Sequence, residues 1–394
     1  MTYDALVIGG GPAGATTALL LARAGWSVAV VEKAAFPRRK VCGEFISATT
    51  LPLLRELGLA DAFNAAAGPE IRRVALFARK KVVTSAMPRG ADVPWGRALG
   101  REHLDALLLE GAARAGAQVW QPCTVVAVRR ERDAALCTIA GKDETITLRG
   151  RTVVAASGSW ERGPLAPPPR AHAPSDLLAF KAHFEDSELP ADLMPLVVFP
   201  GGYGGMVTSD AGRVSLSCCI RRDALARCRA CHPGVPAGEA VLHHIAESCR
   251  GVREALARAR LHSAWLSAGP IRPGIRIGER GGMFFAGNLA GEAHPIVAEG
   301  ISMAMQSAWL LARALDARRD RVCAGDTRAA GQAYTAEWNR NFATRVRAAA
   351  LFAHLAMRPV TAGHLMLPAV QAWPRLLTLG AWLSGKSLQV VPAT

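Results

Sequence analysis

Residues 3–32, YDALVIGGGPAGATTALLLARAGWSVAVVE, decide the fold of this chain. A short β-rich apolar run, Tyr3–Ile8, leads directly into a glycine-rich turn, and a segment rich in alanine and leucine, Ala15–Ala24, follows. A second apolar run, Ser27–Val31, ends on Glu32. The order of strand, G-x-G-x-x-G turn, helix, strand and acid is typical of a βαβ unit that binds a dinucleotide.

The three glycines of the turn have different physical roles. Gly9 is expected to make the tight turn, and Gly11 to let the backbone come close to a pyrophosphate. Gly14 is expected to let the helix pack closely on the preceding strand. Pro12 and Ala13 stand at the start of the helix, whose free N–H groups and positive dipole end favour a phosphate. The turn therefore predicts a site for the adenosine diphosphate half of a dinucleotide.

Glu32 ends the second strand at the position of a ribose ligand. It lies 32 − 14 = 18 residues after the last glycine, where an acid accepts hydrogen bonds from both ribose hydroxyls. An acid at this point disfavours a 2′-phosphate, which argues against NADP in this site. The first motif by itself is compatible with both NAD and FAD.

A second glycine-rich stretch, Gly282–Gly291 (GMFFAGNLAG), begins about 270 residues after the first motif. Its apolar run predicts a strand, Gly287 predicts a turn, and a helical pattern extends from Glu299 to about Leu315. FAD needs a second contact region because its ribityl chain and flavin ring lie far from the adenosine. A helix that begins near Gly300 would aim its positive end at the flavin and favour its anionic reduced form.

Both stretches resemble the FAD fingerprints of the FAD-dependent oxidoreductases with a glutathione-reductase-like fold. Aromatic-ring monooxygenases, geranylgeranyl reductases and flavin-dependent halogenases belong to this superfamily, and the likeness extends from residue 1 to about residue 320. Asn288 takes the place of the usual acid, and Ala298 takes that of a later glycine. Because asparagine can still hydrogen-bond a ribityl hydroxyl, the resemblance implies FAD as the cofactor.

The loop after the second strand carries a further likeness. Phe36–Glu44 (FPRRKVCGE) is similar to a loop of the geranylgeranyl-reductase-like branch, in which a Lys/Arg-x-Cys-Gly stretch lies over the flavin. Arg101, which opens a predicted helix, matches the family arginine that reaches the FAD phosphate and ribityl region. Ser157 replaces a family aspartate that helps NAD(P)H binding, so NADH or NADPH is left open only as an external reductant. The residues expected to bind FAD are Gly9, Gly11, Pro12, Ala13, Gly14, Glu32, Lys33, Lys40, Cys42, Arg101, Gly287, Asn288, Gly300 and Ile301.

The expected fold class is α/β, with a Rossmann-like FAD-binding domain, an inserted antiparallel β-sheet substrate domain and a helical C-terminal tail. Short alternating runs separated by Gly, Pro and Asp turns predict the antiparallel strands. These runs are Leu177–Glu185, Pro195–Phe199, Gly204–Ser209 and Val214–Ile220. A proline-rich stretch, Pro164–Pro174, is interpreted as a linker. The predicted regions are residues 1–70, 98–168 and 271–322 for FAD, 71–97 and 169–270 for the substrate, and 323–394 for the tail.

The net charge of the chain has more than one explanation. Its 394 residues contain 47 Lys and Arg and 32 Asp and Glu, which gives a formal net charge of +15. Only seven of the 47 are lysines, so 47 − 7 = 40 are arginines, and such a bias is what a GC-rich genome produces. We therefore expect no nucleic-acid partner.

Two arrangements are open for the helices of the C-terminal tail. They pack as a cap on the flavin domain, which is favoured, or they rest on a membrane surface through Trp373, Trp382 and basic residues.

The cysteines and the N-terminus predict a reduced, cytoplasmic protein. The start of the chain lacks a basic segment before its first apolar run, and no stretch reaches the roughly 18–20 apolar residues of a spanning helix. Cys228–His232 (CRACH) spells a haem-attachment pattern, but such attachment requires export. Neither a metal cluster nor cysteine chemistry is therefore expected, and the oligomeric state is left open.

His294, in the second fingerprint, is the first candidate for a proton-handling catalytic group, and Glu44 is the second. The leading hypothesis is a flavin monooxygenase (hydroxylase) of secondary metabolism that acts on a hydrophobic small molecule. One alternative is a geranylgeranyl-reductase-like enzyme acting on carbon–carbon bonds, and another is a flavoprotein whose substrate is bound to a carrier or a protein. Halogenation is a minor alternative, because Val197–Gly204 lacks the tryptophans of the halogenase motif and the halogenase lysine has no evident counterpart.

Overall fold

The N-terminal βαβ unit forms as the sequence predicts. In a computed structural model, which describes residues 2–89, 95–131, 133–160, 163–165, 171–357, 367–386 and 390–391, β1 (Thr2–Ile8) is followed by α1 (Pro12–Arg23) and β2 (Val28–Val31). The two strands pair in parallel. The helix begins at Pro12, earlier than the apolar pattern suggests, because proline has the backbone angle of a first helical residue and needs no hydrogen-bond partner there.

The first sheet is buried on both faces. Its strand order is β18-β19-β10-β1-β2-β7, and β8 and β9 extend it through β10. Ala5 and Val7 of β1 pack against the helices, whereas Leu6 and Ile8 pack under the β8–β9 hairpin. Alternate residues of one strand thus enter two different cores, which explains its nearly continuous apolar sequence. The other strands are β7 (Gln118–Trp120), β8 (Thr124–Arg130), β9 (Ala135–Ala140), β10 (Thr145–Ala155), β18 (Glu279–Arg280) and β19 (Met283–Phe285).

Two long helices cover the inner side of this sheet together with α1. α4 (Arg101–Arg114) and α8 (Gly300–Asp316) both pack against α1. Their apolar faces form the largest core of the molecule, and α8 contributes Met305, Leu311 and Leu315 to it. The glycine turn after β1 and the start of α8 therefore lie close together in space, although they are far apart in the sequence.

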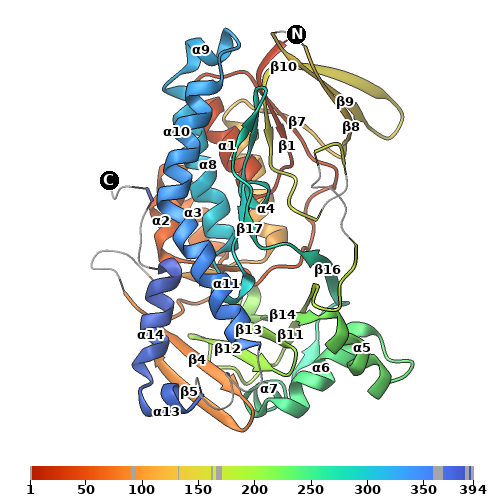
Figure 1. The fold of residues 1–394 in the computed structure, drawn as a ribbon, viewed down its shortest axis with the longest axis vertical. Helices are drawn as coiled ribbons and strands as arrows, with labels where there is room; N and C mark the ends of the chain where they lie inside the picture. Colours follow the sequence, from red (N-terminus) through yellow and green to blue (C-terminus); the bar gives the residue numbers. More distant parts are fainter. Residues whose placement is uncertain are drawn as a thin grey trace.

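The second sheet lies below the first in Figure 1 and has the order β15-β11-β14-β13-β12-β4-β5, with β16 beside β11. All four predicted antiparallel runs form strands of this sheet. Phe180, Ala182 and Phe184 of β11 pack under α5 (Arg222–Cys231), α6 (Ala237–Ser248) and α7 (Arg250–Ala255). The opposite face of the sheet points towards the first sheet. The strands are β4 (Arg73–Ala78), β5 (Lys81–Ala86), β11 (Leu177–Glu185), β12 (Leu193–Phe199), β13 (Gly202–Thr208), β14 (Val214–Arg221), β15 (Arg260–Leu261) and β16 (Leu266–Ile271).

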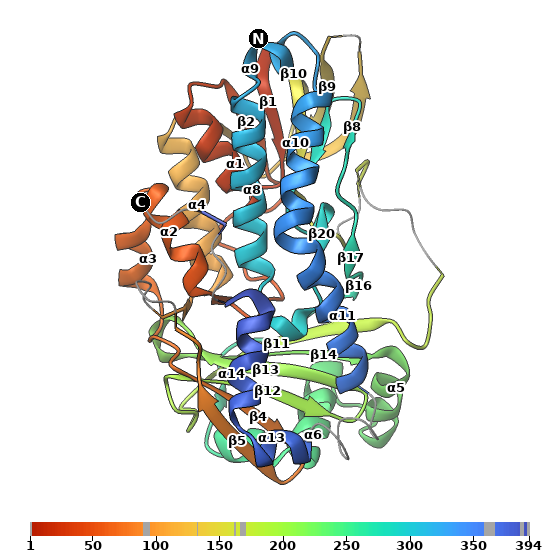
Figure 2. The ribbon, with the colours of Figure 1, turned by 60° about the vertical axis from the view of Figure 1, so that its left-hand side comes forward.

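The C-terminal helices pack along both sheets (Figures 1 and 2). α10 (Arg328–Trp338) continues through a π-helical turn into α11 (Thr344–Ala356), and Figure 2 shows the two following one another down the molecule. Trp338 is buried in the largest core, and Ala353 packs on the second sheet. α13 (Leu367–Ala372) and α14 (Arg375–Ala381) lie beside β4 and β5. The predicted α/β fold with a helical tail is therefore confirmed.

The predicted boundaries of the three regions stay predictions, and the proposed linker Pro164–Pro174 lies partly outside the described residues. Within the part of the chain that is described, no helix is both long and apolar enough to cross a membrane.

Candidate functional site

A cavity of about 850 Å³ lies where the two sheets and the C-terminal helices meet. This volume is in the usual range of cofactor and ligand sites. The glycine turn after β1, the loop 38–44, the start of α8 and the inner face of the second sheet all contribute to its walls. Every residue expected to bind FAD lines the cavity except Gly14.

The glycine turn is shaped for close approach. Gly9 has a φ of +103°, which only glycine adopts readily, and a Cβ on Gly14 would lie 1.8 Å from the Gly9 carbonyl oxygen. Gly14 thus packs against the strand instead of facing the cavity. The first turn of α1 has no side-chain cap. Its free N–H groups are therefore available to an anion, as the phosphate role requires.

Arg101 and Asp105 form a fixed charged pair beside this turn. The guanidinium Nε and Nη2 of Arg101 each donate to the buried Asp105 carboxylate over 2.7 Å. Burial alone would lower the pKa of Arg101, but the charge and hydrogen bonds of Asp105 raise it, so the guanidinium stays ionised. This pair holds the Arg101 guanidinium next to Gly11, where the family resemblance places the cofactor phosphate.

Arg39 is a cavity residue that the sequence analysis missed. Its Nε and Nη2 atoms are buried and have no hydrogen-bond partner among the described residues. Buried guanidinium nitrogens that lack a partner are costly, and a phosphate or a flavin carbonyl oxygen would satisfy them. The uncapped helix, the open glycine backbone and these two nitrogens fit an anionic dinucleotide.

Glu32 is buried at the end of β2. Its carboxylate accepts hydrogen bonds from the N–H groups of Gly10, at 2.8 Å, and Ala34, at 2.9 Å. These bonds fix the carboxylate, and further lone pairs remain for the ribose hydroxyls. Lys33 lines the cavity next to it.

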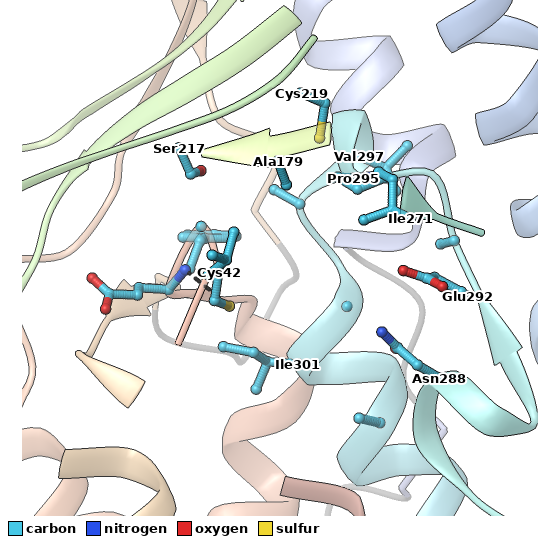
Figure 3. Close-up of a pocket in the computed structure, with 18 of the residues that line it drawn as sticks. Cys42, Ala179, Ser217, Cys219, Ile271, Asn288, Glu292, Pro295, Val297 and Ile301 are labelled. Carbon is cyan, nitrogen blue, oxygen red and sulfur yellow. Dashed lines mark hydrogen bonds between the residues drawn. The ribbon is translucent and has the colours of Figure 1, made fainter. Parts of the chain in front are cut away.

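The second fingerprint forms the opposite wall of the cavity. Figure 3 shows Asn288 and Glu292 on one side, Cys42 on the other, and Ser217, Ala179 and Cys219 of the second sheet above them. α8 begins beneath this region at Gly300 without a side-chain cap. Its positive end therefore faces the cavity, as the sequence predicts.

His294 does not line the cavity itself. Its Nδ1 atom lies 2.6 Å from the hydroxyl of Tyr203, and Tyr203 on β13 lines the cavity. Burial lowers the pKa of His294 to about 4 and raises the pKa of Tyr203 well above its ordinary value. Both side chains are thus neutral through the physiological range. Any influence of His294 on a ligand passes through Tyr203, and its catalytic role stays a prediction.

The buried imidazole should make stability depend on pH. Its pKa in the folded chain is about 4, below the ordinary value of 6.5, so the unfolded chain binds more protons between these values. We expect unfolding free energy to fall by about 3 kcal/mol as the pH decreases from 6.5 to 4. Urea unfolding of the wild type and of His294→Gln measures this, and the variant should lack that part of the decrease. Parallel curves for the two proteins would contradict the expectation.

Glu44 belongs to a buried charged cluster at the edge of the cavity. Its carboxylate contacts the Lys181 Nζ, and its Oε2 lies 2.8 Å from the His183 Nε2. All three side chains are fully buried. Burial alone would raise the pKa of Glu44, but the hydrogen bond from His183 and the charge of Lys181 lower it to about 2. The catalytic role of Glu44 stays a prediction, and these contacts favour positioning.

This cluster links the loop 38–44 to the second sheet. Glu44 directly follows Cys42 and Gly43 in the loop 38–44. Its backbone φ is +63°, a conformation that is unfavourable for a residue with a Cβ. Lys181 and His183 lie two residues apart on β11 and therefore share one face of the strand. Two polar residues at alternate positions of an apolar strand are the only sequence signal that could have indicated them.

Cys228 and Cys231 lie away from the cavity on α5, where Cys228 is buried and Cys231 is exposed. Across the described residues, no group of three or more His, Cys, Asp or Glu side chains is arranged to hold a metal.

Comparison with solved structures supports the fold. The myxobacterial chondrochloren halogenase CndH, described as a new variant of FAD-dependent halogenases, superposes with a TM-score of 0.77. It is 22% identical and covers 99% of this chain and 94% of its own. At that identity the likeness establishes the fold alone.

Curated relatives match only part of the chain. A 1H-pyrrole-2-carbonyl-[peptidyl-carrier protein] chlorinase of Pseudomonas fluorescens is 33% identical over 184 residues, 40% of this chain and 39% of the relative. A digeranylgeranylglycerophospholipid reductase of Thermoplasma acidophilum is 30% identical over 162 residues, 40% of this chain and 39% of the relative. The match thus spans about two fifths of the length of these relatives.

One family model covers most of the chain and agrees with the geometry of the cavity. The model described as an FAD binding domain matches residues 2–322, which include both glycine-rich fingerprints and the second sheet. The protein therefore belongs to the FAD binding domain family of FAD-dependent oxidoreductases, with FAD as its cofactor.

Proposed function

We propose that this protein is an FAD-dependent monooxygenase that hydroxylates an apolar aromatic molecule with an extended hydrocarbon part. The observation that carries this proposal is the apolar extension of the cavity away from the FAD-binding residues. It continues between the second sheet and the C-terminal helices. The apolar residues that line this extension include Val74, Leu76, Leu196, Val198, Val207, Phe352 and Leu377.

Different parts of the cavity would bind different parts of FAD. The start of α1 and the Arg101–Asp105 pair would hold the FAD phosphates, and Asn288 and the start of α8 would hold the ribityl and ring region. Bound FAD would supply the electrons and the activation of O₂. The apolar walls would exclude water, which protects a reactive oxygen donor from hydrolysis.

Tyr203 would orient the substrate. Its hydroxyl lies 2.6 Å from the Nδ1 of neutral His294, and the tautomer of His294 decides which atom donates. The hydroxyl also contacts the Cys219 thiol, and it would add a hydrogen bond with a substrate hydroxyl. Because the pair stays neutral, it places the aromatic ring and does not carry a net charge through the reaction. With electrons from NADH or NADPH, one oxygen atom of O₂ would be added at a ring carbon, whose proton would pass to solvent, and the other oxygen atom would leave as water.

We expect Tyr203→Phe to lower kcat/KM about tenfold, the effect of one lost hydrogen bond to the reacting molecule. FAD content should not change, because Tyr203 lies on the substrate side of the cavity. Tyr3→Phe is the matched control, since Tyr3 hydrogen-bonds Gln118 in the first sheet, away from the cavity. Steady-state rates with a series of alkylphenols measure both, and equal rates for the two variants would remove Tyr203 from the mechanism.

A second candidate function is reduction of a carbon–carbon double bond. The Cys42-Gly43-Glu44 loop, similar to that of the geranylgeranyl-reductase-like branch, lines the cavity and favours it. Halogenation is a third alternative, and the described lysines of the second sheet do not support it. Lys181 contacts Glu44, Lys80 and Lys81 are exposed at the β4–β5 turn, and none of the three lines the cavity. The lysines that do line it, Lys33, Lys40 and Lys386, come from other segments.

The atoms incorporated into the product separate the three reactions. The purified holoenzyme, with NADH or NADPH and the alkylphenol series, should incorporate one ¹⁸O atom from ¹⁸O₂ into each product molecule. Product formation by chemically reduced enzyme without O₂ would overturn hydroxylation in favour of reduction. Chlorinated or brominated product in the presence of chloride or bromide would overturn it in favour of halogenation.

A further inference from the structure

The outer face of α14 exposes large apolar side chains. Leu376, Leu379 and Leu383 follow the i, i+3, i+7 spacing that places residues on one side of a helix. Trp373 and Trp382 flank this stripe, and 70% and 47% of their surfaces are exposed. On the inner face, Thr378 donates to the carbonyl oxygen of Ala86 on β5. We call the five exposed side chains, which lie on α14 and on the residues just before and after it, the α14 ridge: Trp373, Leu376, Leu379, Trp382 and Leu383.

The C-terminal segment that carries the α14 ridge has charges of a single sign. From Trp338 to Thr394 the sequence has no aspartate or glutamate, although it has five arginines and one lysine. Arg347 and Leu351 are both exposed one helical turn apart on α11, and Arg375 is exposed at the start of α14. Exposed apolar and aromatic side chains beside basic ones, with no acid, are the composition of a segment that lies on an anionic lipid surface.

The cavity reaches this same ridge. Leu376 and Leu383 line the cavity and are also partly exposed to solvent. The ridge therefore forms part of the rim between the cavity and the exterior. An apolar molecule that leaves a bilayer under the ridge would meet the largely apolar walls of the cavity on its way to the flavin site.

We propose that the α14 ridge docks on the surface of an anionic lipid bilayer and that the substrate reaches the cavity from the lipid. The docking follows from the exposed ridge and its charge, whereas the substrate route rests on the proposed function. A second copy of this chain is disfavoured as the occupant, because a symmetric contact would bring the basic C-terminal segments of two copies together. An acidic partner protein is the other alternative.

Vesicle binding of the FAD-loaded protein tests the docking without any turnover. We expect co-sedimentation with phosphatidylglycerol vesicles and much weaker binding to phosphatidylcholine vesicles. The double variant Trp373→Ser/Trp382→Ser should bind phosphatidylglycerol about tenfold or more weakly, since it removes two large apolar side chains from the interface. Arg347→Gln/Arg375→Gln should weaken binding about fivefold for each charge removed. Neither tryptophan lines the cavity.

Val126→Ser/Leu261→Ser is the matched control. Val126 and Leu261 are 52% and 43% exposed, on β8 and β15. This variant should bind vesicles like the wild type, and both apolar variants should keep the FAD content and melting temperature of the parent.

Three outcomes would overturn the proposal. They are equal vesicle binding by the ridge and control variants, wild-type binding independent of phosphatidylglycerol, and a dimer in sedimentation equilibrium that only the ridge variant dissociates. If vesicle binding holds while alkylphenol hydroxylation fails, the docking stands and the proposed reaction alone is wrong.

Discussion

Gly11→Ala is expected to weaken FAD binding about a hundredfold or more without loss of apoprotein stability, because it removes charge-assisted hydrogen bonds worth about 1.5–3 kcal/mol each. A Cβ at Gly11 would have no atom nearer than 3.7 Å, the Arg101 Nη2, so the methyl group fits the folded chain. It would, however, occupy the space into which the backbone lets a pyrophosphate approach. Titration of apoprotein with FAD, followed by flavin fluorescence, measures the loss.

Gly14→Ala distinguishes a steric effect on the cofactor from damage to the fold. A Cβ at Gly14 would lie 1.8 Å from a backbone oxygen, so this variant must shift α1 from β1 and lower the stability of the apoprotein as well. We expect urea unfolding to separate the two alanine variants. If Gly11→Ala binds FAD like the wild type, the phosphates do not lie against this turn.

Lys181→Met is expected to destabilise the protein by about 3–5 kcal/mol, the effect of leaving a buried charge without its partner. Glu44 would keep its carboxylate in a fully buried site, with His183 and the Arg101 backbone N–H as its remaining described partners. Lys81→Met is the matched control, because Lys81 is exposed on β5, and it should change stability by less than about 0.5 kcal/mol. Chemical denaturation of all variants gives the comparison.

The Glu44→Gln/Lys181→Met double variant tests whether the buried charges cause the loss of stability in Lys181→Met. Removal of both ions should restore most of the stability that Lys181→Met loses, since neutral side chains avoid the large cost of desolvating an ion. The folded pKa of Glu44, about 2, lies below its ordinary value of 4.5, so its contribution is complete above pH 4.5 and is lost as the pH falls towards 2. The double variant should therefore lose less stability than the wild type between these values. A double variant no more stable than Lys181→Met would show that the cluster does not act through its charge.

The sequence was sufficient wherever a local pattern determines the structure. The glycine turn, the acid after β2 and the apolar runs of the second sheet each depend on neighbouring residues, and each formed as predicted. The start of α8 at Gly300 was also predictable, because a glycine turn and a helical pattern mark it together.

Contacts between distant segments could not be predicted in the same way. Glu44 meets Lys181 across 137 residues, and Tyr203 meets His294 across 91. Nothing in the local sequence around His294 shows that its ring would turn away from the cavity and act through a tyrosine. The contribution of α11 and α14 to the cavity is equally non-local, because an amphipathic helix does not reveal which surface it will cover.

The walls of the cavity have an evolutionary consequence. The family match ends at residue 322, yet the cavity continues to Lys386 through side chains of α11 and α14. Substitutions in these two helices can change the length or width of the molecule that fits, while both flavin fingerprints stay intact. A lineage that shares the first 322 residues could thus diversify its chemistry by altering its last helices.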